Sequence, residues 1–229
     1  MTTPYDDIKD KILDAAIIQV AFDGWSEATF RTAVADAGVD PTIARAVLPR
    51  GAVDLALAYH ARGDQEMLAK LKTLDLAGMK IREKITAAVR ARLETGDREA
   101  VRRGVTLFAL PQHAADGAKA LWDTSDLIWD SIGDTSEDVN WYTKRATLSA
   151  VLSSTVLYWL GDDSPEDEKT WSFLDRRIEN VMQIEKVKAQ VNANPLLKPF
   201  LIAPNWLGKQ IRAPMRRSRG DWPAGARGL

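Results

Sequence analysis

Apolar residues recur at intervals of three and four along almost the whole sequence, a helical period that constrains the fold more than any other feature. Between residues 6 and 22, for example, Ile8, Ile12 and Ala16 share one helical face. No run of alternating Val, Ile and Thr is bounded by turn residues, so no sheet is predicted. Glycines and prolines interrupt the pattern and predict further helices over residues 26–38, 42–48, 52–74, 78–95, 97–110, 113–132, 137–160 and from 164 onward. We therefore expect an all-α chain of about nine helices.

Composition favours binding over catalysis. The 229 residues include no cysteine, which excludes disulfides, thiolate nucleophiles and metal centres built on cysteine. The two histidines, His60 and His113, have no carboxylate three or four residues before them, and no catalytic triad, phosphate loop or metalloprotease motif is present. We therefore expect no enzyme activity, no metal site and no cofactor.

The net charge of −1 conceals an asymmetry. Residues 189–229 carry seven basic residues and one acid, a net +6, which leaves −7 on the first 188 residues. This division predicts an acidic body and a basic tail that meets an anionic partner. We divide the chain into an N-terminal part (1–51), a larger helical part of the same domain (52–188) and the tail (189–229). No run reaches the roughly 18 apolar residues of a membrane span, and the first ten residues do not resemble a targeting peptide.

The first fifty residues follow a helix-turn-helix plan, with Gly24, Gly38 and Asp40-Pro41 separating three helices. With the longer helices behind them, they resemble TetR-type regulators, which bind DNA through such a unit. Between residues 22 and 51, however, three arginines face four acids, and the expected recognition helix offers only Thr42 and Arg45 as base readers. We interpret this unit as a packing module without DNA contacts and expect no nucleic-acid partner. A TetR-type DNA-binding transcriptional regulator remains the alternative.

Two more specific runs lie further along the chain: Asp-x-Asn-Trp-Tyr-Thr-Lys-Arg at 138–145 and Thr-Trp-x-Phe-Leu-Asp-Arg-Arg-Ile at 170–178. Together with Gly-Trp-Ser at 24–26 and Leu-Pro-Arg-Gly at 48–51, they resemble the coenzyme Q (ubiquinone) biosynthesis accessory family, the product of the ninth COQ gene and its bacterial homologues. The resemblance covers residues 6–185. It implies a TetR-like helical fold used for lipid binding.

The resemblance further implies that the chain binds an isoprenoid lipid or ubiquinone intermediate in an apolar pocket, and presents it to the demethoxyubiquinone hydroxylase. It also implies a hydroxylase-binding surface patch formed by Asp138, Trp141, Tyr142 and Arg145. A homodimer is expected. The inner faces of the later helices supply the expected lipid wall: Leu121, Trp122, Ile128, Trp129, Leu148, Leu152, Trp159, Leu174 and Ile178.

The residues themselves leave the position of the aromatic pair open. Trp141 continues the apolar stripe of Leu148 and Trp159, so it either packs in the core or emerges from it near the start of the helix. Tyr142 lies about 120° from that stripe, near the polar face, where an aromatic residue is more indicative of a contact surface.

The tail has the composition of an interfacial membrane helix: bulky apolar residues, a tryptophan and a cationic face. Pro199 and Pro204 predict a kinked or two-piece element. The expected membrane-binding residues are Leu197, Phe200, Leu201, Trp206, Leu207, Lys209, Ile211, Arg212, Arg216 and Arg217. We expect a cytoplasmic protein held peripherally on the inner face of a bacterial cell membrane, or on the matrix side if the chain is mitochondrial. Alternatively, the tail packs back on its own domain or on a second subunit.

Overall fold

A computed structural model of the chain describes residues 4–193 and 213–214. All regular structure in these ranges is helical, which confirms the all-α prediction. The elements are α1 (Pro4–Asp23), α2 (Glu27–Asp36), α3 (Pro41–Val47), α4 (Ala52–Thr73), α5 (Ile81–Glu94), α6 (Arg98–Phe108), α7 (Ala114–Ser131), α8 (Val139–Leu160), the 3-10 turn η1 (Pro165–Asp167) and α9 (Glu168–Ala193).

Side chains cap the starts of several helices. The Ser26 side chain accepts a hydrogen bond from the backbone N–H of Thr29, and Asp40 accepts from the N–H groups of Thr42 and Ile43. Asp138 caps α8 by accepting from the N–H of Asn140. Each cap satisfies backbone donors that have no partner within the helix, so local residue choice explains where these helices begin.

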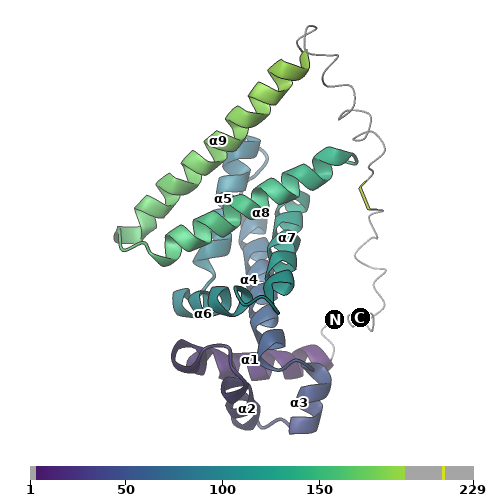
Figure 1. Cartoon of the computed structure of the whole chain (residues 1–229), viewed down its shortest axis with the longest axis vertical. Helices are drawn as coiled ribbons and strands as arrows, with labels where there is room; N and C mark the ends of the chain where they lie inside the picture. The colour runs from purple at the N-terminus through teal and green to yellow at the C-terminus, as the bar shows by residue number, and fades with distance from the viewer. Residues whose placement is uncertain (1–3, 194–212, 215–229) are drawn as a thin grey trace.

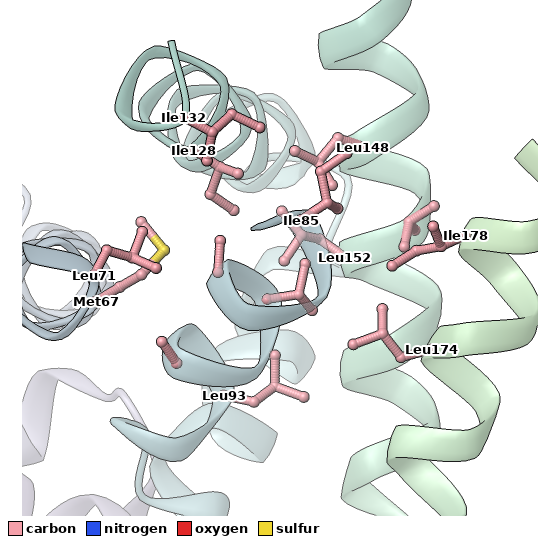
Figure 2. Close-up of a cluster of buried hydrophobic side chains, with 14 of the residues drawn as sticks. Met67, Leu71, Ile85, Leu93, Ile128, Ile132, Leu148, Leu152, Leu174 and Ile178 are labelled. Atoms are coloured by element: carbon pink, nitrogen blue, oxygen red, sulfur yellow. The ribbon is translucent and has the colours of Figure 1, made fainter. Parts of the chain in front are cut away.

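The helices enclose two apolar cores. In Figure 1, α1, α2 and α3 gather at one end, α8 and α9 lie toward the other, and α4 runs from the first group into the second. The first core contains Leu13 and Phe30, and the second contains Ile128 and Leu174. Figure 2 shows the second core, where side chains of α4, α5, α7, α8 and α9 converge. Helix α4 contributes Leu55 to the first core and Met67 to the second, so it joins the two parts.

Helix α6 and helix α7 approach closely at Gly117. A Cβ atom added at Gly117 would lie 2.7 Å from the Cβ of Phe108, which is too close for either backbone to accommodate easily. Gly117→Ala is therefore expected to lower the free energy of unfolding by about 1–3 kcal/mol, measured by urea denaturation. Gly104→Ala in α6 is the matched control, because the nearest side-chain atom, Trp25 Nε1, is 3.6 Å away. We expect that control to be neutral or stabilising by about 0.5 kcal/mol; equal effects at both positions would contradict the close approach.

Candidate functional site

A cavity of about 480 Å³, cavity 1, lies between α4, α5, α6, α7 and α8. Its wall is mostly apolar, with Val101 and Val105 from α6, Leu121 from α7, and Leu152 and Trp159 from α8. Trp25, from the turn before α2, also reaches this wall. The volume lies within the range of about 300–1,000 Å³ that is typical of small-molecule pockets, and predominantly apolar walls are usual for them.

A second cavity of about 540 Å³, cavity 2, lies between α5, α8, α9 and the segment that joins α7 to α8. Its floor includes Trp129, Leu148 and Ile178. Asp134 and Lys144, which form an ion pair with 2.7 Å between Oδ1 and Nζ, belong to its lining. Cavity 2 is therefore lined by apolar side chains together with a charged pair.

The nine expected wall residues divide among several environments. Leu121, Leu152 and Trp159 line cavity 1, and Trp129, Leu148 and Ile178 line cavity 2. Ile128 and Leu174 are fully buried in the second core (Figure 2) and line neither cavity. Trp122 also lines neither cavity and instead contacts the aromatic residues of α8. The helical spacing of apolar residues identifies positions that face inward, but it does not show whether such a position packs in the core or lines a cavity.

A hydrogen-bonded cluster of polar side chains, which the sequence pattern did not indicate, lies at the wall of cavity 1. His60 Nε2 lies 2.8 Å from Thr124 Oγ1, and Thr124 Oγ1 donates to Asp64 Oδ1 at 2.9 Å. Arg92 Nε donates to the same Asp64 oxygen at 2.7 Å. Burial, followed by the charge of Arg92, lowers the pKa of His60. These groups come from α4, α5 and α7, so only the tertiary structure brings them together.

Trp122, Trp141 and Tyr142 form a half-buried aromatic cluster where α7 meets the start of α8. The ring centroids of Trp141 and Tyr142 are 4.8 Å apart, and that of Trp122 is 5.8 Å from Trp141 and 6.4 Å from Tyr142. The side chains of Trp141 and Tyr142 are both of intermediate exposure. We refer to these three residues as the aromatic patch.

Arg145 lies beneath this patch and is fully buried, with 0% of its side chain exposed. It pairs with Asp126, with Asp130 Oδ1 at 3.3 Å and with Asp134 Oδ2 at 3.1 Å, while its guanidinium lies 4.0 Å from the centroid of the Trp141 ring. Because no part of its side chain reaches the surface, Arg145 supports the expected patch from below instead of contacting a partner directly. Asp138 serves as the N-cap of α8 at the exposed edge of the same region.

Asp134 completes the network around Arg145. Burial by itself raises the pKa of its carboxyl group, but hydrogen bonds from Lys144, Ser136 and Arg145 outweigh burial and hold that pKa below its ordinary value. The carboxylate is therefore ionised and binds two cations at the junction between α7 and α8. The sequence pattern placed Lys144 and Arg145 near Trp141, but it did not indicate that acids of α7 and of the segment after it would pair with them.

The expected recognition helix corresponds to α3, which carries a single basic residue. Arg45, the one basic residue of α3, pairs with Glu27 of α2 and lies 4.5 Å over the ring of Phe30. Its charge is thus already compensated within the unit.

The ten expected membrane-binding residues, which fall between positions 197 and 217, all lie outside the described residues. Of the tail, the structure describes α9 as far as Ala193, and then Ala213 and Pro214. The backbone N–H of Ala213 donates to the carbonyl oxygen of Glu137 at 2.9 Å, beside the start of α8. Among the helices of the described part, none is long and apolar enough to cross a bilayer.

Residues 114–185, which comprise α7, α8 and most of α9, match the profile of the COQ9 family. The chain is related to the COQ9 proteins. The mitochondrial ubiquinone biosynthesis protein COQ9 of Drosophila melanogaster is 31% identical over 192 residues, which represent 81% of this chain and 58% of that protein. The COQ9 protein of Xenopus tropicalis is 30% identical over 81% of this chain and 61% of its own length.

A probable mitochondrial coq9 protein of Dictyostelium discoideum is 27% identical, again over 81% of this chain and 63% of its own length. The chain therefore spans about 58–63% of the length of these COQ9 relatives. The matched family region contains the aromatic patch and parts of both cavity walls. The resemblance inferred from the two sequence runs is thus confirmed.

Among solved structures, the chain is similar to a TetR transcriptional regulator from Nitrosomonas europaea, with a TM-score of 0.62 and 19% sequence identity. The superposition covers 76% of this chain and 97% of the regulator. At this level of identity the likeness concerns the fold alone, and it confirms the TetR-like architecture.

Proposed function

We propose that this chain is a non-enzymatic, lipid-binding accessory protein of ubiquinone biosynthesis. It holds an isoprenoid quinone intermediate in cavity 1 and presents it to a demethoxyubiquinone hydroxylase. The observation that carries the proposal is an apolar cavity of about 480 Å³ in a chain related to ubiquinone biosynthesis proteins. An isoprenoid tail gains about 0.8 kcal/mol for each CH2 group that is removed from water, which favours such a wall.

The energetic balance also suits delivery rather than storage. An isoprenoid leaving a bilayer loses about the same stabilisation per CH2 group that it gains in an apolar cavity. Transfer between the two is therefore close to balanced, so a carrier of this kind both loads and releases its ligand. In this exchange the lipid passes directly between the bilayer and the cavity and is never free in water. The protein therefore acts at the membrane surface.

The aromatic patch is the surface that we assign to the hydroxylase. Aromatic residues are enriched at the centres of protein interfaces, because they bury large areas with little loss of side-chain freedom. Trp141 and Tyr142 are half-buried and held in place by Trp122 and Arg145, so the surface is preorganised. Asp138 lies at its exposed edge.

In this proposal the basic tail holds the chain peripherally on an anionic membrane. Each basic residue near such a surface contributes roughly 1 kcal/mol, and the bulky apolar side chains between residues 197 and 211 add to this. The relatives named above are mitochondrial proteins, and the inner face of a bacterial cell membrane and the matrix face of a mitochondrial one are equivalent settings for this role.

Lipid extraction tests the proposal. The full chain, purified from a quinone-producing host, is expected to carry isoprenoid quinones, which mass spectrometry of an organic extract would identify. The same protein is expected to float with anionic liposomes, whereas a variant that lacks residues 195–219 is expected to remain in the soluble fraction. If no lipid co-purifies and liposome binding does not depend on residues 195–219, the proposal is wrong. Sequence-specific DNA binding with a steep salt dependence would instead support a transcriptional regulator.

A further inference from the structure

The polar side chains of cavity 1 are concentrated where α4, α5 and α7 meet. Tyr59 and His60 are adjacent on α4, Arg92 comes from α5 and Thr124 from α7, and all four line the cavity. His60 is joined to Thr124 at 2.8 Å, and Arg92 Nη2 donates to the backbone carbonyl of His60 at 3.1 Å. We refer to these four residues as the polar pole.

The polar pole and the neighbouring Asp64 together carry no net charge. The guanidinium of Arg92 is compensated by Asp64, whose carboxylate is almost wholly buried and accepts from both Arg92 and Thr124. Burial keeps His60 in its neutral form near pH 7, because it lowers the pKa of the imidazole. An anionic ligand group at this pole would therefore be desolvated without a free cation to meet it, which is costly.

Tyr59 supplies a hydrogen-bond donor that the protein itself does not use. Its hydroxyl oxygen accepts from the backbone N–H of Asp97 at 2.8 Å. Burial raises the pKa of the phenol, so the hydroxyl keeps its proton. That proton has no acceptor among the residues that the structure describes, whereas the Thr124 hydroxyl already donates to Asp64. The Tyr59 hydroxyl is thus suited to a ligand oxygen.

The aromatic surroundings of Tyr59 fit a flat ring. The ring centroid of Trp25 lies 5.5 Å from that of Tyr59, and Trp25 is itself part of the cavity wall. Its indole N–H is occupied by the carbonyl oxygen of Ala100 at 3.1 Å, so Trp25 offers an apolar face and not a donor. A planar head group beside Tyr59 would find one hydrogen-bond donor and aromatic contacts.

We propose that the polar pole binds the head group of the ligand and selects for an uncharged quinone or phenol ring. The Tyr59 hydroxyl donates a hydrogen bond to an oxygen of that ring. Because the charges around Tyr59 are already compensated, a carboxylate or phosphate head group is disfavoured. This assignment rests on the proposed lipid-binding function and adds the residue that distinguishes one isoprenoid or alkyl lipid from another. A site that hydrogen-bonds an oxygen discriminates against an analogue that lacks it, since the analogue covers the donor and leaves it without a partner.

Three probes with the same ten-carbon chain separate tail binding from head-group binding: decylubiquinone, decylbenzene and 4-decylbenzoate. Trp25 and Trp159 lie in the wall, so quenching of tryptophan fluorescence reports binding of the quinone, and competition reports the other two. For the wild-type full chain we expect decylubiquinone to bind about tenfold more tightly than decylbenzene, and 4-decylbenzoate to bind most weakly.

Tyr59→Phe is expected to weaken decylubiquinone binding by about threefold to tenfold and to leave decylbenzene unchanged. Unchanged decylbenzene binding also shows that this variant retains a folded cavity. Tyr158→Phe is the matched control, because Tyr158 stacks on Phe173 and does not line cavity 1. That control is expected to bind all three probes as the wild type does.

The possible failures are distinguishable. Equal wild-type affinity for decylubiquinone and decylbenzene, or equal weakening of both by Tyr59→Phe, would overturn the head-group assignment and leave lipid binding intact. Tightest binding of 4-decylbenzoate would identify the pole as an anion site, which also overturns the assignment. Binding of none of the three probes would overturn the proposed function itself.

Discussion

Arg145→Met is expected to lower the free energy of unfolding by about 3 kcal/mol or more, because it removes one partner from a buried charge network. Asp134, whose side chain is 4% exposed, would lose a cation at 3.1 Å and would keep the ion pair with Lys144 and the hydrogen bond from Ser136. The side chains of Asp126 and Asp130 are each 38% exposed, so water can solvate their charges when Arg145 is removed. Asp134 therefore accounts for most of the expected loss of stability. Urea denaturation followed by circular dichroism measures the effect.

Lys119→Met provides the matched control for this substitution. Lys119 pairs with Asp123 across one turn of α7, and both side chains are more than half exposed. Exposed pairs of this kind contribute about 0.3–0.5 kcal/mol, so the control should change stability by no more than that. If Arg145→Met is no more destabilising than Lys119→Met, the network around Arg145 is not the structural element that we describe.

Val156→Trp is expected to weaken decylubiquinone binding at least about tenfold. Val156 of α8 is partly buried and lines cavity 1, so the larger indole would occupy space that the ligand needs. Excluding even two CH2 groups of a ligand costs about 1.6 kcal/mol, which corresponds to slightly more than a tenfold change in affinity. The measurement is the fluorescence titration used for the wild-type chain.

Val139→Trp places the same side chain on the same helix, at a position that lines neither cavity. Val139 is the first residue of α8 and is half-exposed. Its substitution should leave quinone binding unchanged and so controls for the effect of an added tryptophan on the signal. A Val156→Trp protein that stays folded and binds as tightly as the wild type would exclude cavity 1 as the ligand site.

Local residue chemistry was sufficient to predict the helices, although α5 begins three residues and α8 two residues after the expected start. Ser26, Asp40 and Asp138 act within a few residues of their own position, and the helical period of the apolar residues predicts α8 without reference to any other helix. The signature runs at 138–145 and 170–178 were likewise sufficient to indicate the family, because they are properties of the order of residues alone.

The surroundings of particular side chains were beyond the reach of such patterns. Arg145 was expected at a partner surface, but its side chain is buried, where it pairs with Asp126 and Asp130 of α7 and with Asp134 of the segment that follows α7. Trp122 was expected in a lipid wall, yet it packs against Trp141. A helical pattern shows which face of a helix points inward, and it does not show which residues of another helix lie opposite.

The sequence by itself determined the all-α class, the capped helices and the family relationship, since these depend on near neighbours and on residue order. The tertiary structure alone decided where cavity 1 lies and that Tyr59, His60, Arg92 and Thr124 share its wall. The physical reason is that a cavity is space left between helices distant in sequence, and its volume depends on how all of their side chains pack together.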